Sequence, residues 1–134
     1  MIELESPLFT EIAAVLRSAY SGIFVSGEYV PAPASFPAVS IVEMDNTTYL
    51  PAWTNRATEE YALVMYEVNV YSNRTRGKKA EAKAILATID GLMQPYGFER
   101  FFCQPIQNMN DATIYRMTAR YRAVVSEDLT IYRR

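Results

Sequence analysis

Alternating apolar and polar positions predict two long strands in the chain. Between positions 61 and 71 every second residue is apolar, the pattern of a strand with one side in the core. The residues on that side are Ala62, Val64, Tyr66, Val68 and Val70. Between 112 and 125 the core side carries Tyr115, Met117, Ala119, Tyr121, Ala123 and Val125. The other side carries Arg116, Arg120 and Arg122, so this strand is predicted to have an arginine face.

Two segments show the three-to-four residue spacing of amphipathic helices. The first is predicted over 7–20, with Ser6 as its capping residue and Pro7 in its first turn. Its apolar stripe is Leu8, Ile12, Val15, Leu16 and Ala19. The second is predicted over 78–94, and its stripe is Ala82, Ile85, Ile89, Leu92 and Met93. Lys79, Lys83 and Asp90 are expected on the opposite, solvent-exposed face of this helix.

Shorter segments rich in β-branched and aromatic residues predict four more strands, at 23–30, 38–44, 98–106 and 129–132. Pro105 is expected to interrupt the third of these. The segment 46–60 mixes proline, asparagine, tryptophan and acidic residues, which favours a projecting loop or hairpin.

The order of elements predicts an α+β fold in a single domain spanning 1–134. Each helix has one apolar stripe to bury, and the last long strand has one polar side. We therefore expect an antiparallel or mixed sheet with both helices packed on one face and an arm formed by 46–60.

Size and composition agree with this class of fold. A chain of 134 residues, 50% apolar and 21% charged, has the length and core content of one globular domain. No apolar run is long enough to cross a bilayer, and the first residues lack the basic start of a signal peptide. We therefore expect a protein that acts in the cytoplasm, without a membrane.

The chain offers little reaction chemistry. It has no histidine, which removes the commonest general base and metal ligand. Its single cysteine, Cys103, follows two phenylalanines and is expected to be a buried packing thiol. No catalytic residue, cofactor or metal site is therefore predicted, and the protein is not expected to be an enzyme.

Two carboxylate pairs keep a small carboxylate-dependent enzyme open as a minor alternative. Glu43 and Asp45 are expected on the same side of a strand, but two carboxylates are fewer than calcium prefers. Glu59 and Glu60 are adjacent in the chain and point in different directions, so they form no acid/base pair by themselves.

Charge is divided unevenly along the chain. Residues 1–67 carry nine acidic and two basic side chains, a net charge of −7, whereas residues 68–134 carry six and eleven, a net charge of +5. The two halves can intermix and neutralise each other within one fold. Alternatively, the acidic side of one copy can pack against the basic side of the next, the heterologous contact that closes rings. The overall net charge of −2 disfavours nucleic acid as the main ligand.

The arginine face is the main candidate interface. The positive charges of Arg116, Arg120 and Arg122 repel one another unless carboxylates neutralise them. Glu67, with Asn69, on the preceding long strand can do so only in part. This face is either a solvated surface with scattered ion pairs, a contact with the acidic half of a neighbouring subunit, or a surface close to DNA.

The predicted arm supplies the other candidate contacts. Trp53 is either an exposed interface anchor or folded back on the core. The candidate interface residues are Trp53, Glu59, Glu60, Glu67, Arg116, Arg120 and Arg122.

From Val68 onward, about half of the chain resembles the tail terminator, or head-to-tail joining, proteins of long-tailed bacteriophages and prophages. The segments that carry the resemblance are 68–73 (Val-Asn-Val-Tyr-Ser-Asn), 77–83 (Gly-Lys-Lys-Ala-Glu-Ala-Lys), 97–100 (Gly-Phe-Glu-Arg), Pro105, Asn108, 111–116 (Asp-Ala-Thr-Ile-Tyr-Arg) and 120–124 (Arg-Tyr-Arg-Ala-Val). Residues 1–60 match that family only in the order of their elements.

The resemblance implies a structural virion protein at the head-tail junction of a phage tail. Such a subunit forms a homo-oligomeric ring, a hexamer, on the finished tail tube, stops further tube addition, and offers a docking surface to the head-completion or connector protein. DNA is expected only to pass through the ring lumen, and no cofactor is implied. A tail tube or head-completion (neck) subunit of similar fold is the main alternative.

Overall fold

A sheet and two α-helices make up the part of the chain that the computed structural model describes, which is residues 1–30, 33–49, 61–107, 111–126, 129 and 131–132. In chain order the elements are α1 (Glu5–Ala19), β1 (Phe24–Ser26), β2 (Ala38–Thr48), β3 (Tyr61–Ser72), α2 (Lys78–Met93), the 3-10 helix η1 (Gln94–Tyr96), β4 (Glu99–Ile106), β5 (Tyr115–Ser126) and β6 (Ile131–Tyr132).

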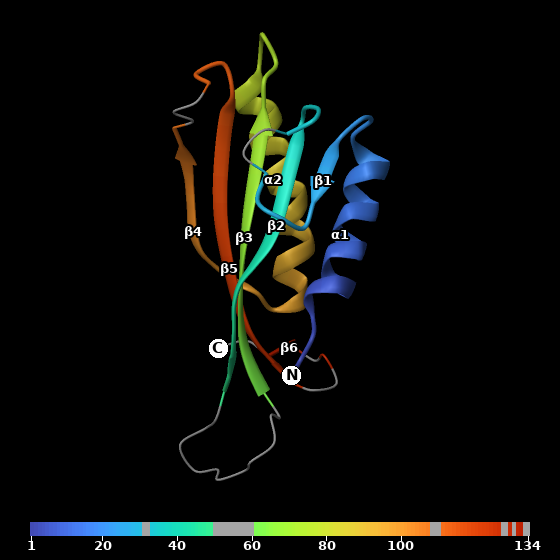
Figure 1. Cartoon of the computed structure of the whole chain (residues 1–134), viewed down its shortest axis with the longest axis vertical. Coiled ribbons are helices and arrows are strands. Elements are labelled where there is room, and N and C mark those ends of the chain that lie inside the picture. Colours follow the sequence, from blue (N-terminus) through green and yellow to red (C-terminus); the bar gives the residue numbers. More distant parts are fainter. Residues whose placement is uncertain (31–32, 50–60, 108–110, 127–128, 130, 133–134) are drawn as a thin grey trace.

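The strands form one mixed sheet with the order β1-β2-β3-β5-β4 (Figure 1). The β1–β2 pair is parallel, and the β2–β3, β3–β5 and β4–β5 pairs are antiparallel. The short β6 pairs with the end of β5. The strands that precede α2 therefore lie on one side of the sheet, and those that follow it lie on the other.

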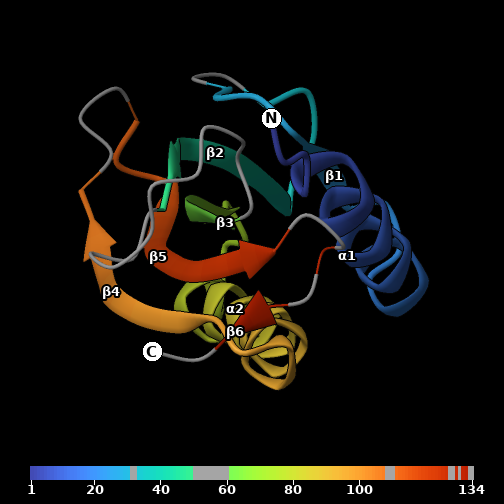
Figure 2. The same cartoon turned by 90° about the horizontal axis from the view of Figure 1, so that it is seen from below.

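Both helices cover the same face of the curved sheet (Figure 2). The apolar stripes predicted from the sequence form the core there, and the largest fully buried side chains are Tyr66, Tyr121, Ile12, Leu16, Ile41, Ile85, Ile89 and Met93. The opposite face carries no helix in the described part of the chain. The predicted α+β domain, with two helices on one face of a mixed sheet, is confirmed.

Strand lengths differ from the predictions on the N-terminal side. The first strand is only Phe24–Ser26, not 23–30, whereas β2 continues to Thr48. Residues 45–48 remain paired with β3 beyond the predicted end of the strand. The predicted arm 46–60 therefore begins inside β2, and its residues 50–60, including Trp53, Glu59 and Glu60, lie outside the described residues.

Two local predictions were wrong. Ser6 is not the helix cap, because α1 begins one residue earlier, and the Ser6 backbone N–H is instead bound by a Glu3 side-chain oxygen at 2.7 Å. Pro105 does not interrupt β4, which continues to Ile106. A proline is tolerated there because β4 is an edge strand, where a missing N–H can face away from the sheet.

Gly77, just before α2, and Gly91, inside α2, test how backbone conformation decides the effect of a glycine-to-alanine change on stability. Gly77 precedes α2 with a φ of 79°, and a Cβ there would have no atom within 4 Å. Gly77→Ala should lower the free energy of unfolding by about 1 kcal/mol through backbone strain alone. Gly91→Ala, inside α2 with equally open space, should raise it by about 0.5–1 kcal/mol. Urea unfolding of both variants measures this, and effects of the same sign would contradict it.

Candidate protein interface

Asn69 organises the open face of the sheet. Its side chain is fully buried, although it lies on the face that the helices leave uncovered. Its Oδ1 accepts hydrogen bonds from Arg116 Nε at 2.9 Å and Thr118 Oγ1 at 2.7 Å. Its Nδ2 donates to Glu67 Oε1 at 3.0 Å and Ser40 Oγ at 3.4 Å. All the capacity of the amide is used, and three strands are joined through it.

The other two arginines of β5 are paired with carboxylates inside the subunit. Arg120 Nε lies 3.0 Å from Glu67 Oε2. Arg122 contacts Glu99 through Nε at 2.9 Å and through the terminal Nη2 at 3.3 Å. This hydrogen bond with Glu99 raises the pKa of Arg122 above its usual value.

Each arginine of the face also lies over an aromatic ring. The guanidinium carbon is 5.7 Å from the Tyr71 ring centre for Arg116, 4.8 Å from that of Phe102 for Arg120, and 4.7 Å from that of Phe101 for Arg122. Stacking and the Nε bonds together hold these side chains in place, which lowers the entropy cost of a later contact.

The sequence placed Glu67, Arg116, Arg120 and Arg122 on one face, and the structure brings them together there. It did not indicate Glu99 or the phenylalanines as partners. Their positions depend on a register shift in the β4–β5 pair between Arg100 and Phe102. Periodicity alone cannot locate such a shift, because it changes which residues of an edge strand share a face. The roles of these residues in an interface remain predictions.

A second polar cluster, on the helix side, centres on Asp90. Its Oδ1 accepts a hydrogen bond from the Tyr121 hydroxyl at 2.8 Å and lies 3.0 Å from Arg100 Nη1. Its Oδ2 accepts one from Gln94 Nε2 at 2.8 Å. The attraction of Asp90 raises the pKa of Arg100. Asp90 was expected on the solvent-exposed face of α2, but it is only 18% exposed because it ties α2 to β4 and β5.

The carboxylate pair Glu43 and Asp45 is not a site. Glu43 is opposite Tyr66 and Asp45 is opposite Met65 in the β2–β3 pairing, so the two side chains lie on opposite faces. A bulge at Met44 inserts one extra residue between them and reverses the expected alternation. Glu43 Oε2 instead accepts a hydrogen bond from the Tyr66 hydroxyl at 2.7 Å.

Cys103 is exposed, which corrects the expectation of a buried thiol. It pairs with Ala119 of β5, a fully buried residue on the helix side, but it lies on the edge strand. The helices pack over the middle of the sheet, and α2 contacts β3 and β5. The edge position therefore leaves Cys103 open to solvent, whereas Phe101 and Phe102 before it are half-buried.

Charge is separated across the sheet. The described residues of α1, β1, β2 and their connections, 1–30 and 33–49, carry six acidic side chains and one basic one. We call this region the acidic flank. Residues 73–107 and 111–122, which include α2, β4 and most of β5, carry nine basic and four acidic side chains, and we call them the basic flank. Within the sheet, β1 and β2 of the acidic flank lie on one side of β3, and β5 and β4 of the basic flank lie on the other (Figure 1), whereas α2 packs against both β3 and β5.

The ion pairs seen among the described residues mostly lie within one half of the sequence, 1–67 or 68–134. Glu67 and Arg120 connect the acidic and basic halves of the sequence. The pairs Arg74–Glu81, Arg100–Asp90 and Arg122–Glu99 lie within the basic half. The charges of the two halves are therefore not cancelled by the contacts seen between described residues.

A metal site and a membrane-spanning helix are both absent from the described residues. They contain no group of three or more histidine, cysteine, aspartate or glutamate side chains placed to hold a metal ion. Neither described helix has the length and apolarity needed to span a membrane. No known protein-family model matches the chain, and no curated protein is significantly similar to it.

Proposed function

We propose that this protein is a structural subunit of a phage or prophage tail, which forms a ring on the finished tail tube and joins it to the head. The proposal starts from the resemblance of about half of the chain to tail terminator proteins. It draws further support from the α+β fold and from the separation of charge into two flanks. The ring is proposed to contain six copies, as the resemblance implies.

The separation of charge is the observation that carries the proposal. A subunit with a net charge of −5 on one flank and +5 on the other, counted over the described residues, favours contact between unlike flanks of two copies. Such a contact uses different surfaces on the two copies, so it can repeat from copy to copy, and it closes a ring when the rotation between neighbouring copies is a whole fraction of a turn. A two-fold dimer could also pair the acidic flank of each copy with the basic flank of the other, so the choice of a ring rests on the resemblance to tail terminator proteins.

A ring of this kind ends polymerisation by shape. One of its two surfaces must complement the last layer of tube subunits, whereas the other must fail to reproduce the growing end of the tube. That second surface is then free to bind the head-completion or connector protein. Arg116, Arg120 and Arg122 are proposed to contribute to one of these contacts, since they are held in place before binding. DNA passes through the lumen of the ring in this proposal.

Self-association should depend on the lysines of the basic flank. Lys79 and Lys83 are exposed on α2. Neither side chain forms a hydrogen bond or an ion pair with another described residue. Reversing both charges, with Lys79→Glu and Lys83→Glu, should weaken self-association at least tenfold, about 1.4 kcal/mol or more. Analytical ultracentrifugation over a range of protein and salt concentrations measures this.

The charge-preserving variant, Lys79→Arg with Lys83→Arg, is the matched control and should assemble like the wild type. Added salt should weaken assembly of the wild type, because exposed charges are screened beyond a Debye length of about 8 Å at physiological ionic strength. A monomer at every concentration and salt, which also does not bind tail tubes, would count against the ring.

A tube-growth assay distinguishes a tail terminator from the alternative, a tail tube or neck subunit. When added to elongating tail tubes, a terminator should stop growth and remain at one end, visible by electron microscopy. Incorporation along the whole tube would instead identify a tube subunit. Binding to the head connector without binding to tubes would identify a neck subunit.

A further inference from the structure

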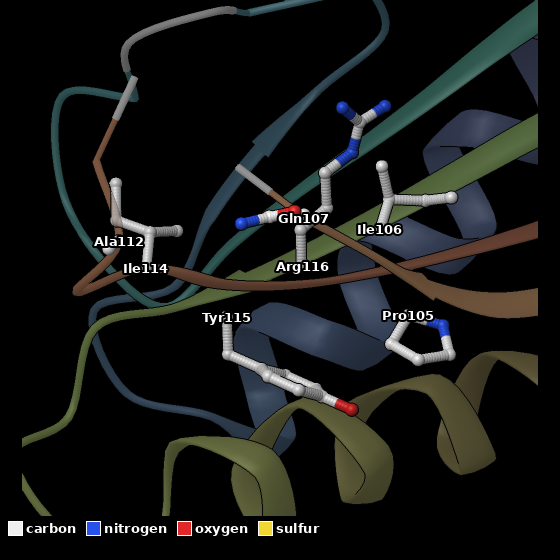
Figure 3. Close-up of a pocket in the computed structure, with 7 residues that line it drawn as sticks. All are labelled: Pro105, Ile106, Gln107, Ala112, Ile114, Tyr115 and Arg116. Carbon is white, nitrogen blue, oxygen red and sulfur yellow. The ribbon is translucent and has the colours of Figure 1, made fainter. Parts of the chain in front are cut away.

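A pocket of about 380 Å³ lies at the end of the β4–β5 pair, beside the arginine face. It is lined by Pro105, Ile106, Gln107, Ala112, Ile114, Tyr115 and Arg116 (Figure 3). Arg116, Ile106 and Gln107 project to the open-face side of the sheet, whereas Tyr115 and Pro105 project toward α2 (Figure 3). The volume falls in the range of small-molecule sites, roughly 300–1,000 Å³.

Arg116 differs from the other two arginines of the face. Arg120 and Arg122 are paired with carboxylates, but the hydrogen-bond partner of Arg116 is the neutral amide of Asn69. Its positive charge is therefore not neutralised by a direct ion pair among the described residues. The bond to Asn69 uses only Nε, so both terminal nitrogens of the guanidinium remain available. Arg116 thus presents a fixed pair of donors that suits a two-oxygen anion.

The surroundings of Arg116 distinguish one anion from another. Ile106, Ala112 and Ile114 give the pocket apolar walls, and Gln107 adds an exposed amide with no hydrogen bond among the described residues. A free phosphate has nothing to place against those walls. A peptide segment with a carboxylate next to an apolar side chain satisfies both parts of the site.

We propose that this pocket binds a protein segment that carries a carboxylate beside an apolar side chain. The guanidinium of Arg116 and the amide of Gln107 hold the carboxylate, and Ile106 and Ile114 contact the apolar side chain. This site is a property of the single subunit and does not depend on the proposed ring, so the two proposals can fail separately.

The test is an NMR titration of the full ¹⁵N-labelled chain with the dipeptide acetyl-alanyl-leucine, which ends in a free carboxylate. The peptide should shift the amide signals of 105–107 and 112–116 and bind in the millimolar range. The same peptide with its carboxylate amidated should bind at least tenfold more weakly. Inorganic phosphate, the third probe, should bind more weakly than the acidic peptide.

Two variants identify the residues involved. Arg116→Gln should weaken peptide binding at least tenfold, whereas Arg120→Gln, on the same strand and face, should change it less than twofold. Gln107→Ala changes an exposed side chain that forms no hydrogen bond with another described residue, and should weaken binding severalfold even if Arg116→Gln alters the fold. Equal binding of acid and amide, phosphate binding as tight as the peptide, or no effect of Arg116→Gln and Gln107→Ala would each overturn the proposal.

Discussion

Replacing Asn69 with alanine should lower the free energy of unfolding by about 3–4 kcal/mol. The variant removes four hydrogen bonds at a fully buried position, two of them to the charged partners Glu67 and Arg116. A hydrogen bond contributes about 0.5–1.5 kcal/mol net, and about 1.5–3 kcal/mol when one partner is charged. The sum is reduced because Glu67 and Arg116 can turn toward water once the amide is gone. Denaturant unfolding followed by circular dichroism measures the change.

The matched control for this prediction is Gln104→Ala. Gln104 lies on the edge strand β4 opposite Thr118 of β5, is exposed, and makes no side-chain hydrogen bond among the described residues. Its replacement should change stability by less than about 0.5 kcal/mol. A loss below about 1 kcal/mol for Asn69→Ala would show that water replaces the amide and that Asn69 does not organise the open face.

The alternation of residues was enough to predict the centre of the sheet. In β3 and β5 the side that points to the helices is apolar over five or six alternate positions, because these strands are covered by α2 along much of their length. The same regularity placed Arg116, Arg120 and Arg122 together. The predicted helices match α1 and α2 to within two residues at each end.

The errors occur where the period of two is broken. The bulge at Met44 sends Glu43 and Asp45 to opposite faces, and the shift near Phe101 brings Glu99 to Arg122. Each bulge adds one residue to one strand only, and that choice is made by the pairing with a distant strand. Cys103 illustrates a related limit. An apolar sequence predicts burial, but the edge of this sheet extends beyond the helices that cover its centre.

The open face can bind a partner at low entropic cost. Its arginines are fixed by rings below them and by Nε bonds beside them, so little side-chain freedom is lost on contact. Rigid, partly exposed cations of this kind suit the recognition of carboxylates with defined geometry. The hydrogen bond from Arg116 Nε to Asn69 Oδ1 holds the Arg116 guanidinium in one orientation. Asn69 is therefore a positioning residue for Arg116 in any contact that the open face makes.

Stability should fall steeply above pH 10 because two core tyrosines resist ionisation in the folded state. Burial, followed by the hydrogen bond to Glu43, raises the pKa of Tyr66 far above its ordinary value of 10.0. Burial, followed by the hydrogen bond to Asp90, does the same for the pKa of Tyr121. The unfolded chain loses both protons above pH 10, whereas the folded chain keeps them. The stabilisation is therefore complete below pH 10 and is lost as the pH rises.

For each tyrosine that ionises only in the unfolded chain, the free energy of unfolding should fall by about 1.4 kcal/mol per pH unit above pH 10. For the pair the slope is roughly 2.7 kcal/mol per pH unit. Urea unfolding at a series of alkaline pH values measures this slope. Tyr66→Phe and Tyr121→Phe should each reduce it by about 1.4 kcal/mol per pH unit, whatever their effect at neutral pH. Tyr29→Phe, at a position 58% exposed, is the control and should leave the slope unchanged. Equal slopes in all three variants would mean that the hydroxyls of Tyr66 and Tyr121 ionise in the folded protein as they do in the unfolded chain. Burial and the carboxylate partners would then not keep these hydroxyls protonated.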